Sequence, residues 1–153
     1  MAAHHLAQLN IAKARAALDS ELLQDFVNRL DEINTLADSS AGFVWRLEDE
    51  EGDATNIRLF DDPLMIVNLS VWEDLESLKD FAYRTAHAEL IKARTQWFEK
   101  PTSAYQVLWW IPAGTQPSPE EAAQKLELIR SEGPTAQAFS FARPFTPQGE
   151  PGR

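Results

Sequence analysis

The stretch that decides the fold runs from Met65 to Lys100, MIVNLSVWEDLESLKDFAYRTAHAELIKARTQWFEK. From Met65 to Trp72 every odd position is apolar, which is the period-two pattern of a strand with one buried face. After Trp72 the apolar residues recur at helical spacing, and Asp74 stands where an N-cap is expected. The stretch therefore predicts a strand followed by helix, and it contains His87, the histidine that lies outside the N-terminus.

The helical part has two apolar stripes that face different ways. The first stripe consists of Leu75, Leu78, Phe81 and Ala82. The second consists of His87, Leu90, Ile91, Trp97 and Phe98. At about 100° per residue the second stripe is rotated by roughly 150° from the first. A straight helix would need burial on opposite sides, so we expect a break near residues 84–86.

The remaining elements follow from the same two periods. Alternation predicts strands at residues 5–12, 43–48 and 105–111, and a last short strand at Phe139 and Phe141. Helical spacing and capping residues predict helices at 20–37, after Asp19 and Ser20, and at 119–131, after Ser118. Residues 57–60 are a short strand or part of a loop. This order is the split βαβ pattern of a ferredoxin-like α+β fold with an added C-terminal helix and strand.

Length and charge limit the partners. The chain has 153 residues, enough for one domain, which we place at residues 1–145 with a flexible tail at 146–153. A net charge of −10 would repel a phosphate backbone, so nucleic acid is not an expected partner. No apolar run is long enough to cross a bilayer, and no signal peptide is recognisable, so we expect no membrane contact and a cytoplasmic location. The absence of cysteine excludes disulfides and thiolate metal sites.

One face of the predicted sheet mixes polar and aromatic residues. Its members are Leu6, Gln8, Asn10, Val44, Arg46, Asn68, Ser70, Trp72, Gln106, Leu108 and Trp110. A ferredoxin-like sheet has helices on one face only, so we expect this mixed face to be bare unless a second subunit covers it. The sequence therefore predicts a homodimer whose sheets face each other across a cavity that admits a small-molecule ligand. A β-bulge in any strand would swap the faces there.

The sequence also resembles known families. The run VNLSVWEDLESLKDFAYRTAH is similar to the dimeric α/β-barrel superfamily, which includes antibiotic-biosynthesis monooxygenases and heme-degrading monooxygenases. Nearly the whole chain resembles an uncharacterised domain-of-unknown-function family of that superfamily. The residues that carry this likeness are GFVWR at 42–46, DDP at 61–63, the Trp97-Phe98 pair and LWWIPAG at 108–114. The resemblance implies a dimeric α/β barrel and no agreed activity.

Heme-degrading relatives use an asparagine on the first strand, and a tryptophan and an iron-binding histidine on the second helix. Asn10 and His87 stand at comparable places in this chain, whereas Phe81 stands at the position of the tryptophan. The resemblance thus makes heme a candidate cofactor with one residue of the pattern changed. We expect no other cofactor and no metal, because neighbouring strand residues such as His4 and His5 point to opposite faces.

The candidate site residues each have a functional and a structural interpretation. His87 is the candidate catalytic group, as a general acid or base, or else it hydrogen-bonds a helix end at the break. The candidate ligand-binding residues are Asn10, Arg46, Asn68, Trp72, Tyr83 and Trp110. Amides and a guanidinium can orient a carbonyl or an anion, or instead bond across a dimer interface. The indoles can stack on a ligand or pack at the subunit contact, and Tyr83 can reach the pocket mouth or lie on the surface.

Two functions remain open from the sequence. The first is a monooxygenase-like oxidoreductase that acts on a small hydrophobic or aromatic compound in a barrel pocket. The second is a ligand-binding or purely structural dimer without turnover. Fold analogy alone supports neither reaction. Access of an acid or base to the cavity distinguishes the two functions.

Overall fold

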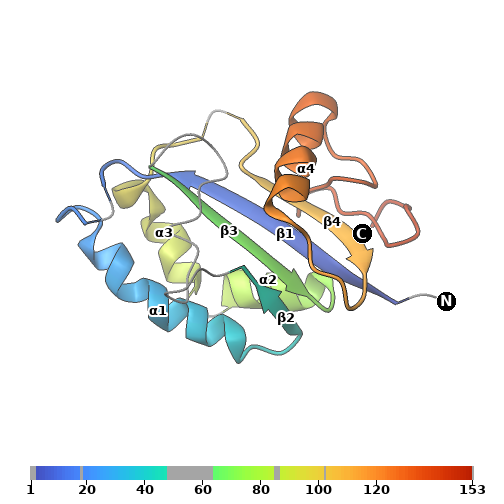
Figure 1. Cartoon of the computed structure of the whole chain (residues 1–153), viewed down its shortest axis with the longest axis horizontal. Coiled ribbons are helices and arrows are strands. Elements are labelled where there is room, and N and C mark those ends of the chain that lie inside the picture. The colour runs from blue at the N-terminus through green and yellow to red at the C-terminus, as the bar shows by residue number, and fades with distance from the viewer. Residues whose placement is uncertain (1–2, 18, 48–63, 85–86, 102, 153) are drawn as a thin grey trace.

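The computed structural model describes residues 3–17, 19–47, 64–84, 87–101 and 103–152. Its elements in chain order are β1 (His4–Lys13), α1 (Gln24–Asp38), β2 (Phe43–Arg46), β3 (Met65–Trp72), α2 (Leu75–Arg84), α3 (His87–Trp97), β4 (Gln106–Pro112) and α4 (Pro119–Glu132). The strands form one antiparallel sheet in the order β2-β3-β1-β4 (Figure 1). This is the strand order of the split βαβ pattern, and it confirms the ferredoxin-like α+β fold.

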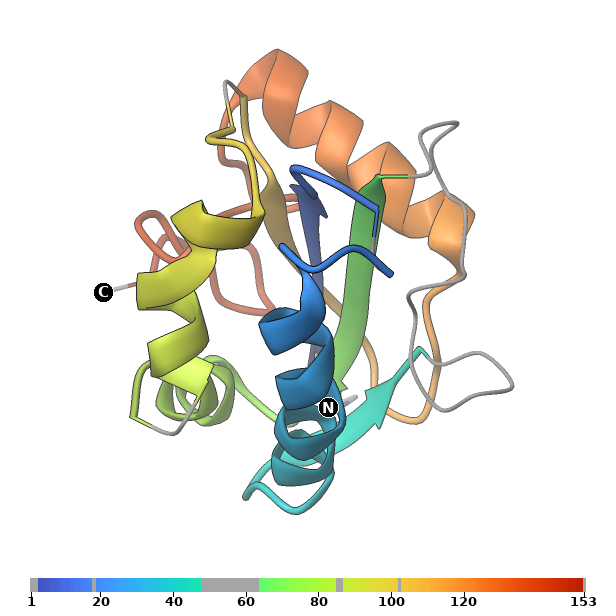
Figure 2. The same ribbon diagram turned by 90° about the vertical axis from the view of Figure 1, so that its left-hand side faces the viewer.

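The mixed face of the sheet is not bare. Helices α1, α2 and α3 lie on it, and Figure 2 shows α4 on the opposite side of the sheet. Leu6, Trp72 and Leu108 of the mixed face are each 1% exposed or less. They form one core with side chains from α1, α2, α3 and the C-terminal segment, residues 138–152. The buried side chains that they join are Leu23, Phe26, Ile33, Leu78, Phe81, Trp97 and Phe139. The expectation that only a second subunit could cover this face is therefore wrong, because the chain covers the face itself.

The apolar face of the sheet is covered by α4. Ala122, Leu126 and Ile129 of this helix are buried, and they join the core formed by the odd-numbered residues of β1, β3 and β4. Glu121 ties the helix to the sheet, because its Oε2 accepts a hydrogen bond of 2.9 Å from Trp109 Nε1. Ser118 Oγ accepts from the Glu121 amide, as the predicted N-cap requires. The helix that looked like an appendage in the sequence is thus the third layer of an α/β/α arrangement.

Strand β2 contains the face swap that a bulge produces. Phe43 pairs with Trp72 and Trp45 pairs with Val71, so the register shifts by one residue between Phe43 and Trp45. Because of this shift Phe43 packs on the mixed-face core, whereas Trp45 packs on the apolar-face core. The sequence placed Phe43 and Trp45 on the same face, and that assignment is wrong at Phe43.

A glycine permits the close approach that precedes β2. Gly42 has a φ of 82°, and a Cβ atom there would collide with the Ser77 side chain. The Gly42 carbonyl also accepts a hydrogen bond of 2.7 Å from the Glu73 amide. The turn between α1 and β2 therefore docks against the start of α2 only because this residue has no side chain.

The other boundaries agree with the sequence to different degrees. Strand β3 has the predicted bounds, and the predicted break is confirmed, since α2 ends at Arg84 and α3 begins at His87. Helix α1 begins at Gln24, later than predicted, because residues 19–23 form turns and Leu23 takes the N-cap position without a side-chain bond. The predicted last strand is a single bridge between Phe139 and Leu108. Residues 57–60, for which a short strand or loop was expected, lie outside the described residues.

No helix among the residues described has both the length and the apolar composition needed to span a membrane.

The contact between α4 and the sheet should contribute strongly to stability. Leu126 is 1% exposed beneath α4, so Leu126→Ala should lower the free energy of unfolding by about 2–5 kcal/mol through lost burial and a cavity. Leu22 is 48% exposed, and Leu22→Ala should change the same quantity by less than about 0.5 kcal/mol. Urea denaturation of both variants checks this, and equal effects would show that α4 is not docked.

Candidate functional site

The polar residues of the mixed face are arranged in rows across the sheet. The strand register places Trp72, Leu6 and Trp110 in one row, Ser70, Gln8 and Leu108 in the next, and Asn68, Asn10 and Gln106 in the third. The first row is at the end of the sheet where β3 leads into α2. The candidate residues Asn10 and Asn68 are therefore neighbours two rows away from Trp72 and Trp110.

Polar groups of the middle row bond to one another inside the chain. Gln8 is 4% exposed, and its Nε2 donates to Ser70 Oγ at 2.8 Å and to Asn68 Oδ1. Ser70 Oγ also accepts from Trp72 Nε1 at 2.9 Å. Buried donors are costly when unpaired, so this network fixes side chains beneath the helices. Gln8, which the sequence did not single out, is the residue that connects it.

Trp72 does not line a pocket. It is 1% exposed, with its ring centroid 5.1 Å from that of Phe81 and 5.4 Å from that of Phe43. Its indole nitrogen is engaged by Ser70. The structure therefore gives Trp72 the packing role that was its alternative interpretation, although within one chain.

Of the other candidates on this face, Asn10 and Asn68 are neighbours, and Arg46 lies apart from them. Asn68 is exposed and Asn10 is half-buried. Arg46 lies at a separate depression of about 280 Å³, where its Nε donates to Asp38 Oδ1 at 2.8 Å and its Nη2 to Asp38 Oδ2 at 3.3 Å. This two-point pairing ties β2 to the end of α1. Asn10, Asn68 and Arg46 thus do not converge on one pocket.

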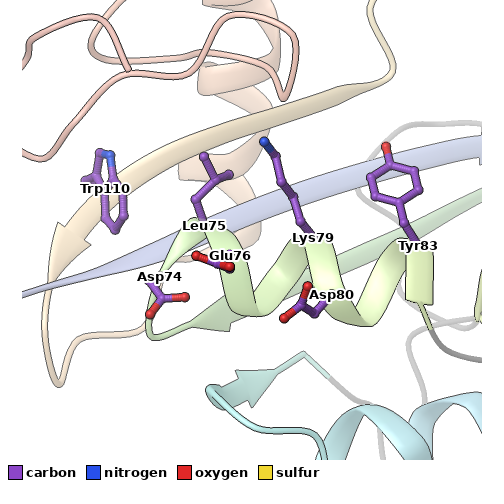
Figure 3. Close-up of a pocket in the computed structure, with 7 residues that line it drawn as sticks. All are labelled: Asp74, Leu75, Glu76, Lys79, Asp80, Tyr83 and Trp110. Carbon is purple, nitrogen blue, oxygen red and sulfur yellow. The ribbon is translucent and has the colours of Figure 1, made fainter. Parts of the chain in front are cut away.

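A larger groove lies along α2. It has a volume of about 680 Å³ and is lined by Asp74, Leu75, Glu76, Lys79, Asp80, Tyr83 and Trp110 (Figure 3). The volume is in the range of small-molecule sites. Of the candidate residues, Tyr83 and Trp110 meet here, whereas Trp72, Asn10, Asn68 and Arg46 do not line this groove.

Helical spacing places one row of side chains along the groove. Leu75, Lys79 and Tyr83 are four residues apart and point to the same side of α2, whereas Asp80 points to the opposite side (Figure 3). Eight residues of helix span about 12 Å, which is the separation between the Leu75 and Tyr83 positions along the axis. Leu75 and Lys79 were missed from the sequence, although their spacing from Tyr83 was the signal that could have found them.

The C-terminal segment, residues 138–152, contacts both aromatic residues of the groove, Trp110 and Tyr83. Phe145 O accepts a hydrogen bond of 2.8 Å from Trp110 Nε1, and Phe141 packs edge-on against Tyr83 with ring centroids 5.8 Å apart. Two backbone bonds of 2.8 Å join Phe139 to Leu108 of β4. The segment therefore connects both ends of the groove, and its contacts leave Tyr83 56% exposed.

The charges at the groove have different surroundings. Asp74 caps α2, because its Oδ1 accepts from the Ser77 amide at 2.8 Å. Asp80 interacts with another group of the protein, and Glu76 is exposed to solvent. Within the part of the chain that the structure describes, no group of three histidine, cysteine, aspartate or glutamate residues is placed to hold a metal ion.

Two of the residues that resemble the heme-degrading pattern, Asn10 and Phe81, lie at different places along the sheet. Phe81, at the tryptophan position, is 8% exposed and stacked against Trp72 in the core. Asn10 lies in the third row of the sheet, away from Trp72. Helix α3 begins at His87, whose side chain lies outside the described part of the structure. Because the packed Phe81 has no free face for a porphyrin, these residues fit heme poorly.

Hemin titration tests this conclusion. Adding the wild-type protein and His87→Ala to hemin should give superimposable visible spectra, because Phe81, at the tryptophan position of the heme-degrading pattern, is packed in the core against Trp72. Any nonspecific hemin adsorption would appear equally in both proteins. A Soret shift that the His87→Ala variant loses would contradict this expectation and restore heme as a cofactor.

Comparison with solved structures gives distant matches. The protein of unknown function NE2512 from Nitrosomonas europaea matches with 12% identity and a TM-score of 0.48 over 77% of this chain and 99% of its own. A protein from the same organism named "Putative antibiotic biosynthesis monooxygenase" matches with 11% identity and a TM-score of 0.48 over 77% of this chain and 97% of its own. A conserved protein from Methanosarcina mazei Go1 matches with 14% identity and a TM-score of 0.47 over 71% and 91%.

Comparison with families is more decisive. No curated protein matches the chain significantly. The model of one family, described as a domain of unknown function, covers residues 5–152. This range contains every strand and helix of the sheet layers except the first residue of β1. It also agrees with the resemblance in sequence. The chain therefore belongs to the DUF3291 family, a domain of unknown function.

Proposed function

We propose that this protein binds a small hydrophobic or aromatic compound in the groove that α2 and Trp110 of β4 line. The observation that carries the proposal is the placement of two incompletely buried aromatic rings, Tyr83 and Trp110, at one groove of about 680 Å³. Flat rings give a ligand large contact area with little loss of side-chain entropy. Leu75 adds an apolar wall between them.

Contacts with the C-terminal segment position the two aromatic rings of the groove before a ligand binds. Trp110 is held by the Phe145 carbonyl, and its ring centroid lies 6.5 Å from that of Phe139. Tyr83 is supported by Phe141. A ring that is already fixed loses little freedom when a ligand arrives, which favours binding. These supports come from the C-terminal segment, so the proposal also assigns that segment a role.

The second part of the proposal is that the bound compound undergoes a reaction. The resemblance in sequence to antibiotic-biosynthesis monooxygenases supplies oxygenation of the bound compound as the reaction class, with His87 as the candidate proton carrier. The geometry supports binding, and a ligand-binding protein without turnover is the alternative. Oxygen uptake measured with a compound that binds distinguishes the two functions, since only an oxygenase consumes oxygen in proportion to ligand.

Ligand-observed NMR with one- and two-ring aromatic fragments tests the binding site. Tyr83→Ala should weaken the fragments that bind the wild type by about tenfold, because it removes an aromatic contact of about 1 kcal/mol and the area that the ring buries. Tyr105 is also a partly exposed tyrosine but lies outside the groove, so Tyr105→Ala should leave binding unchanged.

The proposal fails if no fragment binds the wild type. It also fails if the two tyrosine variants weaken binding equally, because the site would then lie elsewhere. Matched circular dichroism spectra of the variants show that both are folded before the comparison is made.

A further inference from the structure

Lys79 is the cationic member of the groove lining. It is four residues from Leu75 and four from Tyr83, and its amine points to the same side of α2 as their side chains (Figure 3). Its chain is half-buried along the groove. The long stem lies beside apolar surface while the ammonium remains available, as is usual for lysine. Lys79 is thus placed between the two aromatic walls.

Three carboxylates line the same groove as Lys79, and among the residues that the structure describes none of them pairs with its ammonium. Asp74 is used by the Ser77 amide, and Asp80 is engaged and points away from the Lys79 side. Glu76 is exposed to solvent. On the side of α2 that carries Leu75 and Tyr83, Lys79 is therefore the charged group between the two aromatic rings.

We infer that the ligand of this groove is an aromatic compound with an anionic group, a carboxylate or a phenolate, which Lys79 binds. This inference rests on the proposed function and adds the chemical class of the ligand to it. The ring of the ligand would lie against Tyr83, Leu75 and Trp110, and its anionic oxygen would accept hydrogen bonds from the Lys79 ammonium. Charge-assisted hydrogen bonds of this kind are stronger than neutral ones.

The geometry also limits the size of the ligand. By the helical rise per residue, Leu75 and Tyr83 are about 12 Å apart along the axis of α2, with Lys79 at the midpoint. A compound of one or two rings, with the anionic group attached directly to a ring or through a short chain, spans this distance. A long acyl chain would leave the groove, and a second anionic group at the Leu75 end would lie near Asp74.

Three probes that share a naphthalene ring and carry groups of different charge test the inference by calorimetry: naphthoate, neutral naphthamide and cationic naphthylmethylamine. The wild type should bind naphthoate about tenfold more tightly than naphthamide, because a hydrogen bond between two charged groups is stronger than one that involves a neutral group. It should bind naphthylmethylamine most weakly. Raising the salt concentration should reduce the preference for naphthoate and leave naphthamide binding unchanged.

Variants of Lys79 separate its charge from its packing. Lys79→Gln should bind naphthoate and naphthamide equally, whereas Lys79→Arg should keep the preference for naphthoate. Lys125 of α4 is also half-buried and lies outside the groove, so Lys125→Gln is the matched control and should keep the wild-type preference.

The outcomes distinguish the inference from the proposed function. If naphthamide binds as tightly as naphthoate, or if naphthylmethylamine binds most tightly, the inference is wrong and the groove is still a binding site. If the preference for naphthoate persists in Lys79→Gln, another cation binds the ligand and the inference is also wrong. If the wild type binds none of the three probes, the proposed function fails together with the inference.

Discussion

The sheet of this protein has large apolar side chains on both faces, and burial of both faces by the same chain is the constraint on which the structure depends. Trp72, Leu6 and Leu108 point to one face, and Trp109 and Leu9 to the other, each 1% exposed or less. At roughly 25 cal/mol per Å² of apolar surface, leaving either face in water would cost more than a domain of this size can lose. The helices are therefore distributed to both sides of the sheet.

Because helices cover both faces of the sheet, the candidate site lies elsewhere than in the predicted cavity between two sheets. A cavity between two facing sheets requires a bare face, and neither face is bare in this chain. The aromatic groups that remain accessible are at the border of the sheet, where α2 and the C-terminal segment approach β4. The residues that line this groove come from a single chain. The homodimer stays a prediction, and the covered faces make a second copy unnecessary for their burial.

The sequence predicted the elements that depend on local pattern. Strand β3 has the predicted bounds because its alternation is unbroken, and the α2–α3 break follows from two stripes that no straight helix could bury. No local sequence signal predicts the bulge that moves Phe43 to the other face, because both faces of the sheet have an apolar core on which an aromatic residue can pack. Ser20 bonds to the Ala17 carbonyl instead of capping α1, so a capping residue was present without a cap.

Part of the site could also be predicted from residue types and local pattern. Tyr83 and Trp110 were identified as candidates, and they line one groove. Trp72 is from the same face and the same row as Trp110, but α2 places Phe81 over it, and this contact is set by tertiary packing. The role of the C-terminal segment could not be predicted, because Phe145 contacts Trp110 through its backbone carbonyl, which leaves no trace in residue type.

The concentration dependence of unfolding is the most direct test of burial within one chain. A protein whose sheet needs a partner has no stable monomer, so its stability depends on protomer concentration. The account predicts that the urea midpoint is the same at about 0.5 µM and at about 50 µM, because folding does not release or consume a partner. A midpoint that rises clearly with concentration would contradict it, because folding would then be coupled to association with a second copy.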